Sequence, residues 1–222
     1  MTDADGSRLE QPGAFSLLFN LLPLLHLASG IALLGVLGGG TGSRLGWLAL
    51  WIYLLPPFCS RLMIAVWGRP EGSLTQDMPA YRVWWVLTQW QILFNRFPWL
   101  EEGLRLVPGL YALWIAMWGG RLSPRAYVAP GVWITDRHAV RVEAGAVLGM
   151  KSILCGHLVR RDEAGRWLVL AGTPVVEAEA ILGGDARLGP GAILRAGEVL
   201  PTGRFVRPFE AWPRRQDDAA DQ

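Results

Sequence analysis

The chain has 222 residues, enough for one or two domains, and 51% of them are hydrophobic. The formal net charge is +2, and no Lys/Arg-rich patch contains interleaved aromatic residues, so we expect no nucleic-acid partner. The two cysteines, Cys59 and Cys155, lack metal-like spacing, and we expect both to be free thiols.

The N-terminal part of the chain contains a long uncharged stretch. A polar tail covers residues 1–13, and no charged residue occurs between Glu10 and Arg44. The apolar segment 15–37 is long enough to cross a bilayer, since a crossing helix needs roughly 20 apolar residues. The tail before it is acidic, and no cleavage pattern of small residues follows a short apolar core. We therefore predict a transmembrane helix and not a cleavable signal peptide.

A second apolar segment, residues 45–67, follows a glycine-rich turn. Together the two segments predict a transmembrane helical hairpin over residues 14–67. The second segment contains Pro56 and Pro57, and proline removes a helix hydrogen bond and clashes with the preceding turn. We therefore expect a kink or a local break at this pair.

The positions of the arginines predict the orientation of the hairpin. Arg61 and Arg69 lie at the end of the second apolar segment or just after it, whereas the connecting loop carries only Arg44. Cytoplasmic flanks of membrane helices are enriched in Lys and Arg. We therefore expect both termini on the cytoplasmic side of a bacterial cytoplasmic (inner) membrane, with the lipid bilayer as a partner.

Residues 68–121 read as a polar linker followed by short helices rich in tryptophan. Apolar residues recur at helical spacing after residue 82, but the helix is too short and too polar to span a bilayer. The piece 98–118 is interrupted by Pro108-Gly109. Indole rings favour the headgroup layer, so we predict two interfacial helices. The alternative is that these helices pack against the hairpin as ordinary core.

A repeat of six residues organises the remaining chain, residues 122–206. Aliphatic residues return at this period, with Gly, Pro and Ala between them, and the clearest run is Leu170, Val176, Leu182, Leu188, Leu194, Leu200 and Val206. Such a period predicts a parallel β-helix in which three hexads form one triangular coil. A second polar tail is expected over residues 207–222.

The period is interrupted twice. The join from Ile134 to Val142 is two residues too long for a hexad, and the segment from Arg160 to Trp167 is polar and fits no hexad. We interpret the second break as an excursion from one corner of the β-helix. Insertions in repeat folds map to loops on one face, often the binding face.

The strings VEAGAVLGMKSILCGHLV and LGGDARLGPGAILRAG within residues 126–206 resemble the hexapeptide-repeat acyltransferases. The resemblance implies a left-handed parallel β-helix, hence an α+β chain when the helices before it are included. It also implies a homotrimer and transfer of an acyl group from acyl-CoA to a hydroxyl or amine. The same helix carries carbonic anhydrases and catalytically silent subunits.

Three residues are candidates for catalysis. His157 matches the position at which similar acyltransferases keep their general base, so the resemblance assigns it that role. His138 lies in the overlong corner beside Asp136, and a carboxylate can fix the tautomer of an imidazole. The alternative for both histidines is a structural or interface role. A zinc site is disfavoured because only two histidines lie in the repeat region, and we expect no metal.

Four further residues are candidates for substrate binding: Lys151, Arg137, Cys155 and Gly156. Lys151 is the only lysine in the chain and would meet a phosphate of the donor or a lipid headgroup. The alternative for it is a solvated corner.

Two hypotheses for function follow. In the first, the chain is a membrane-bound acyltransferase that uses acyl-CoA and a membrane-associated acceptor. In the second, it is a non-catalytic scaffold subunit of a larger membrane protein complex, built on the same β-helix.

Overall fold

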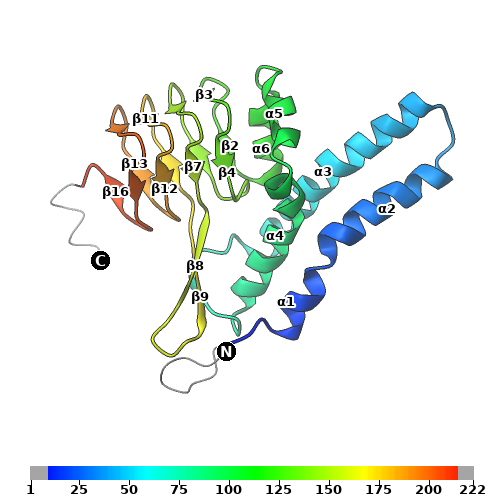
Figure 1. The fold of residues 1–222 in the computed structure, drawn as a ribbon, viewed down its shortest axis with the longest axis horizontal. Coiled ribbons are helices and arrows are strands. Elements are labelled where there is room, and N and C mark those ends of the chain that lie inside the picture. The colour runs from blue at the N-terminus through cyan, green and yellow to red at the C-terminus, as the bar shows by residue number, and fades with distance from the viewer. Residues whose placement is uncertain (1–9, 215–222) are drawn as a thin grey trace.

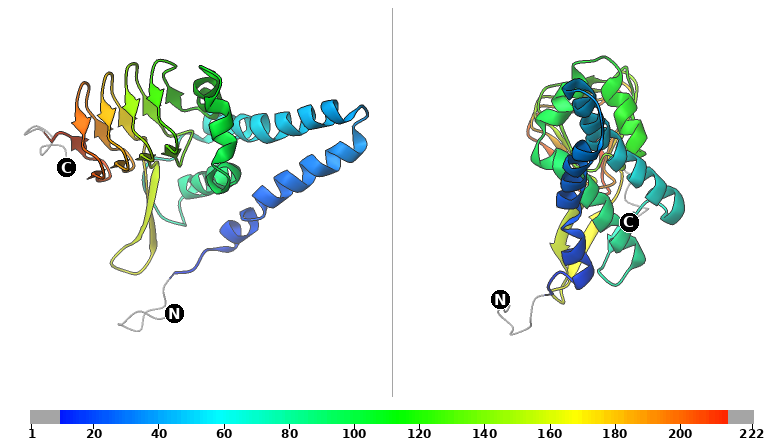
Figure 2. Two further views of the ribbon diagram at one scale, coloured as in Figure 1. Left: turned by 45° about the horizontal axis from the view of Figure 1, so that its top comes forward. Right: turned by 90° about the vertical axis from the view of Figure 1, so that its right-hand side faces the viewer.

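The computed structural model describes residues 10–214, so the predicted polar tails at 1–13 and 207–222 lie partly outside the described range. A helical hairpin and a parallel β-helix extend in opposite directions from a layer of short helices (Figures 1 and 2). This arrangement confirms the predicted α+β fold, in which apolar helices precede a β-helix of hexapeptide repeats.

The hairpin consists of α1 (Ala14–Phe19), α2 (Leu22–Val36) and α3 (Thr41–Trp67). Its two arms, Ala14–Val36 and Thr41–Trp67, are long and apolar enough to cross a membrane, with mean hydropathies of 2.0 and 1.6. In the apolar 18-residue stretch of each arm only 11% and 17% of the residues are buried, whereas the core helices of a soluble protein are mostly buried.

The proline pair does not interrupt α3, so of the two expected outcomes, a kink or a local break, the break does not occur. Pro57 has no N–H to donate to the carbonyl of Tyr53 four residues earlier. The indole Nε1 of Trp114 donates to that oxygen instead, at 2.9 Å. Both prolines are buried. Packing and an outside donor therefore compensate for the lost helix hydrogen bond.

The layer between the hairpin and the β-helix contains α4 (Pro79–Arg96), α5 (Trp99–Arg105) and α6 (Leu110–Trp118). Helix α4 packs against all three helices of the hairpin and holds the first coils of the β-helix through polar side chains. Trp84 and Trp114 are buried in protein, as the core-packing alternative expects, whereas Trp99 is exposed.

The β-helix consists of three parallel sheets, which we call the first, second and third. Four complete coils and the start of a fifth are described. The first sheet holds β2 (Arg121–Leu122), β5 (Arg141–Val142), β10 (Val175–Val176), β13 (Ile193–Leu194) and β16 (Ala211–Trp212). The second holds β3 (Tyr127–Val128), β6 (Val147–Leu148), β11 (Ile181–Leu182) and β14 (Val199–Leu200). The third holds β4 (Trp133–Ile134), β7 (Ile153–Leu154), β12 (Arg187–Leu188) and β15 (Phe205–Val206).

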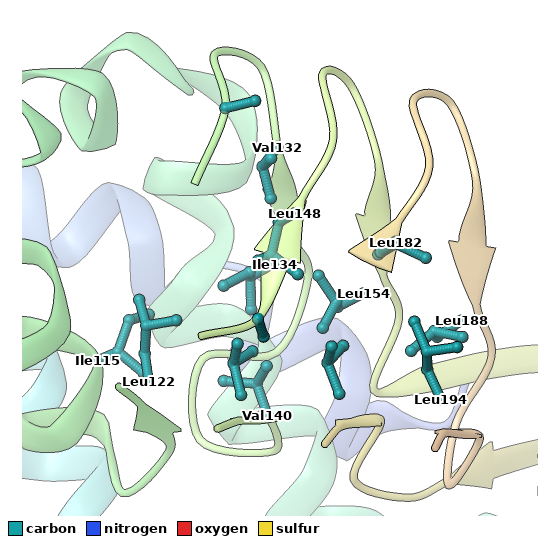
Figure 3. Packing of buried hydrophobic residues seen from close by; sticks show 14 of the residues in the cluster. Ile115, Leu122, Val132, Ile134, Val140, Leu148, Leu154, Leu182, Leu188 and Leu194 are labelled. Carbon is teal, nitrogen blue, oxygen red and sulfur yellow. The ribbon is translucent and has the colours of Figure 1, made fainter. Parts of the chain in front are cut away.

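The six-residue period marks the side chains that point into the β-helix. Leu182, Leu188, Leu194 and Leu200 are completely buried, and Figure 3 shows three of them along the narrow core. Aliphatic and aromatic side chains of α6 continue this core at its N-terminal end, where Ile115 lies beside Leu122 (Figure 3). Helix α6 therefore closes the open end of the first coil.

Two details differ from the predicted repeat. Leu170 matches the period but lies in β9 (Trp167–Ala171), outside the coils, because this strand belongs to an antiparallel β-hairpin. At the other end, β16 adds a strand beyond Val206, within the segment that we expected to be a polar tail.

The polar segment Arg160–Trp167 lies at the tip of that hairpin, as the predicted excursion requires. Strands β8 (His157–Arg161) and β9 (Trp167–Ala171) pair antiparallel, and β1 (Gly72–Leu74) adds a third strand to β9. The main-chain N–H of Trp167 donates to a carboxylate oxygen of Glu10 at 2.5 Å. The β-hairpin of β8 and β9 thus contacts the chain just before α1, the first apolar helix.

Candidate functional site

The two interruptions of the repeat meet at one corner of the β-helix. The overlong join leaves the third sheet after Ile134, and the β-hairpin of β8 and β9 leaves the same sheet after Leu154. Ile134 and Leu154 are paired in neighbouring strands. We call this junction between the third and first sheets the site corner. Because the two insertions stack on each other there, they bring together residues that are about twenty positions apart in sequence.

Asp136 and His157 face each other at the site corner. The Nδ1 atom of His157 lies 2.8 Å from Oδ2 of Asp136 and 3.0 Å from Oδ1. The carboxylate is buried, with 1% of its side chain exposed, whereas 23% of the imidazole side chain is exposed. One end of the pair is therefore fixed inside the protein, and the ring remains partly accessible.

Neighbouring groups orient the carboxylate. The hydroxyl of Thr135 donates to Oδ2 of Asp136 at 2.6 Å, and the main-chain N–H of Gly156 donates to the same oxygen at 3.1 Å. A Cβ atom at position 156 would lie only 2.5 Å from the Cβ of Asp136. Glycine at this position therefore permits the close approach of the two insertions.

The pair shifts the pKa of each member. Burial acts to raise the pKa of Asp136, but the charge of His157 and the hydrogen bonds from His157 and Thr135 hold it well below its ordinary value. Burial acts to lower the pKa of His157, and the charge and hydrogen bond of Asp136 outweigh burial and raise it. An ionised carboxylate only accepts hydrogen bonds, so Nδ1 must carry a proton. In the neutral ring the lone pair is then on Nε2.

Helix α4 forms the second wall of the site corner. The rings of Trp84 and His157 meet at 67° with centroids 5.1 Å apart. Further along the same helix, Gln91 accepts the main-chain N–H of Arg137 at 2.6 Å, and Asn95 donates to the carbonyl of Thr135 at 3.3 Å. These contacts fix the overlong join on which Asp136 lies.

His138 lies near the pair but is not part of it. It is buried, and its Nδ1 lies 3.2 Å from the amide nitrogen of Gln91. Burial lowers its pKa to about 4 despite the nearby charge of Asp136. A neutral, buried ring held by an amide fits a structural role better than proton exchange with a substrate.

Arg137 points into the protein. Its guanidinium donates to Oε1 of Glu101 at 2.6 Å through Nε and to Oδ1 of Asn95 at 2.9 Å through one terminal nitrogen. The other terminal nitrogen also contacts Glu101. The side chain of Arg137 is 1% exposed, so this charge holds α5 against the site corner and is not presented to a ligand.

The other predicted binding residues lie at two different corners of the β-helix. Lys151 is at the corner between the second and third sheets, with a left-handed φ of 57°, so the structure does not bring it together with His157. Gly156 supports Asp136 as described above. Cys155 donates its thiol to the carbonyl of His157 at 2.7 Å, and burial, followed by the charge of Asp136, raises its thiol pKa.

Sequence reasoning missed Thr135, Trp84, Gln91 and Glu101 as parts of the site. One signal was available in α4, where Gln91 and Asn95 are four residues apart in an otherwise apolar stretch and so share a face. In residues 10–214, no three side chains of the His, Cys, Asp and Glu types gather closely enough to hold a metal ion.

Comparisons with known proteins find partial similarity to solved structures. No protein-family model matches the chain, and no curated protein matches it. A hexapeptide-repeat acetyltransferase from Vibrio cholerae is 14% identical, with 53% of this chain and 83% of that chain covered and a TM-score of 0.36. Serine acetyltransferase 1 from Entamoeba histolytica, in complex with L-cysteine, is 14% identical, with 76% and 75% covered and a TM-score of 0.23.

A third solved structure, serine acetyltransferase isoform 3 from the same organism, is 9% identical, with 94% of this chain and 84% of that chain covered and a TM-score of 0.24. At these scores the overlaps carry no argument about function. The β-helix of hexapeptide repeats itself supports the resemblance noted in the sequence, and the geometry of the site corner must support any proposed activity.

Proposed function

We propose that the chain is an acyltransferase that moves an acyl group from acyl-CoA to a hydroxyl or amine of a membrane-associated acceptor, with His157 as the general base. The observation that carries the proposal is the Asp136–His157 pair. Its carboxylate is buried and ionised, its Nδ1–H is fixed, and its ring is partly exposed. This is the arrangement that a general base requires.

The proposed reaction moves one proton through His157. Nε2 of His157 takes the proton from the acceptor O–H or N–H while the acceptor atom attacks the thioester carbonyl carbon. The C–S bond then breaks, and the imidazolium returns the proton to the leaving thiolate of CoA. Asp136 stabilises the imidazolium between these steps, since a negative charge beside a cationic ring favours its charged form.

Purified full-length protein in detergent, incubated with acetyl-CoA and a bacterial membrane extract, tests the proposal. Mass spectrometry would identify the acetylated acceptor. We expect His157→Ala to lower turnover by roughly two to four orders of magnitude, the usual contribution of a general base. Arg160→Ala, an exposed change in the same β-hairpin, is the matched control and should retain turnover.

If the wild type acetylates nothing in the extract, or if His157→Ala is as active as the wild type, the proposal fails. The scaffold alternative then gains support if the protein is purified in fixed ratio with other membrane subunits. A homotrimer, expected from the resemblance, is measured in the same preparation by light scattering.

The two apolar arms of the helical hairpin support a membrane-associated acceptor. We propose that both arms cross the bacterial inner membrane and that the β-helix lies on the cytoplasmic side, where acyl-CoA is available. Arg61 and Arg69 at the end of α3 support this orientation. A reporter that is active only in the periplasm, fused after Val206, should be inactive, and an active fusion would reverse the orientation.

A further inference from the structure

The turn between α5 and α6 exposes a group of large apolar side chains that no described segment covers. The exposed apolar residues of the turn and of the start of α6 are Leu106, Val107, Leu110 and Leu113. Leu106 is 84% exposed and Leu113 is 61% exposed. Exposed apolar residues that are scattered singly are normal on soluble monomers, whereas larger contiguous groups mark surfaces that contact a protein partner, a ligand or a membrane.

Contacts between α6 and α3 place this turn relative to the hairpin. Trp114 contacts Tyr53, and two residues later the carbonyl of Ala116 accepts a hydrogen bond from Arg61 at 2.9 Å. The residue numbers of these contacts rise together along the two helices, so α6 runs in the same sense as α3. Helix α3 runs from the tip of the helical hairpin toward the helical layer. Its N-terminal end, where the turn lies, is therefore the end nearer the hairpin tip.

Contact with lipid also requires that the main-chain polar groups of the turn be paired within the protein. The N–H of Val107 donates to the carbonyl of Leu104 at 3.4 Å, and the N–H of Leu110 donates to the carbonyl of Val107 at 3.1 Å. Gly109 adopts a left-handed φ of 79° and caps α6, and its carbonyl accepts from Leu113 at 3.0 Å.

We propose that this turn inserts into the same leaflet of the lipid bilayer as the adjoining end of the hairpin. The inference rests on the membrane attachment within the proposed function and is independent of acyl transfer. Helix α6 packs directly on α3, whose own exposed side chains include Leu50, Leu54, Phe58 and Leu62, and this neighbouring apolar surface favours lipid over a protein occupant.

Nitroxide labels at three single cysteines test this placement in the full chain, with Cys59 and Cys155 replaced by Ala. Val107→Cys reports on the turn, Ile31→Cys on α2, and Val199→Cys on the β-helix. Val107 and Val199 are 52% and 53% exposed and so form a matched pair. The protein is reconstituted into vesicles of phosphatidylethanolamine and phosphatidylglycerol. Accessibility to oxygen, which concentrates in hydrocarbon, is compared with accessibility to a water-soluble nickel chelate.

We expect the oxygen-to-nickel ratio at position 107 to be severalfold higher than at position 199 and to approach the ratio at position 31. A ratio at 107 equal to that at 199 overturns the inference, as does protection from both reagents, which would indicate a second protein on the turn. If position 31 is accessible to nickel as well, the membrane attachment in the proposed function is wrong, and the inference fails with it.

Discussion

The indole of Trp84 meets the imidazole of His157 at a steep angle, with 5.1 Å between the ring centroids. Trp84 lies on α4, the helix that packs on the hairpin, and His157 begins the first strand of the β-hairpin. The proposed base is therefore held from two directions, by Asp136 through Nδ1 and by a helix that contacts the apolar arms of the helical hairpin. Its position depends on both halves of the molecule.

Replacing Asp136 with Asn should move the pH dependence of turnover. In the wild type the base is active when neutral, so turnover falls as the pH drops through the raised pKa of His157. The Asp136→Asn change would remove the charge and the hydrogen bond that raise this pKa, so the falling limb should shift to lower pH. Maximal turnover should also decrease, because Nδ1–H is no longer fixed. A pH–rate profile checks both effects, and an unchanged limb would contradict them.

The same pair links stability to pH. A folded-state pKa that is raised above the unfolded value means that the protonated His157 stabilises the fold at low pH. This contribution is complete below the unfolded pKa of about 6.5 and is lost as the pH rises through the folded pKa. The stability difference between wild type and Asp136→Asn should therefore be larger at mildly acidic than at alkaline pH, as chemical unfolding in detergent would show.

Thr135 should act on catalysis through Asp136. Its hydroxyl donates to Oδ2 at 2.6 Å, so Thr135→Val removes this bond while keeping the shape of the side chain. We expect turnover to fall with little change in KM, and Thr135→Ser to restore it. Thr173→Val is the control, since Thr173 contacts Glu71 in an exposed position elsewhere. If the Ser and Val variants lose turnover equally, the hydroxyl is not the positioning group.

Glu101 should contribute more to the stability of the fold than Glu102, its neighbour in the same helical turn. It pairs with the buried Arg137, and removing one partner of a buried ion pair costs about 3–5 kcal/mol. Glu102 is 40% exposed in its pair with Arg105, and Glu102→Gln should cost about 1 kcal/mol or less. Chemical unfolding of Glu101→Gln and Glu102→Gln compares the two, and equal losses would show that burial of the pair is unimportant.

Leu188→Ala should destabilise the β-helix by roughly 2–5 kcal/mol, the usual range for a fully buried leucine. Ile181→Ala is the matched control because Ile181 points outward and is 40% exposed. Because Ile181 has less contact with the core, Ile181→Ala should lose less stability than Leu188→Ala. Thermal unfolding distinguishes the two variants. Unchanged stability of Leu188→Ala would mean that this residue does not point inward.

The sequence predicted the β-helix well because burial in a narrow coil repeats with each hexad. Leu182, Leu188 and Leu194 could be assigned inward from spacing alone. The same test wrongly included Leu170, since a strand of a hairpin can match the period by coincidence. The spacing of aliphatic residues shows where hexads recur in the sequence. It does not show which residues belong to an insertion that lies outside the coils.

The pairing of Asp136 with His157 was not predictable from sequence. Both residues were candidates, but their contact depends on two insertions that stack at the same corner. The role of Trp84 was also hidden, because a tryptophan in an amphipathic helix fits a membrane interface as well as a protein core. Only the packing of α4 distinguishes these environments.

The hydrogen bond from Trp114 to Tyr53 makes the helical hairpin and the helical layer a single unit of assembly. An excised hairpin of residues 14–67 would leave the Tyr53 carbonyl unpaired in apolar surroundings, where an unsatisfied group costs several kcal/mol, on the order of 2–7. Residue 114 is synthesised after the helical hairpin, so the hairpin reaches its final form only once α6 has docked. Grafting another protein's helical hairpin onto this β-helix would therefore require a redesigned α6 as well.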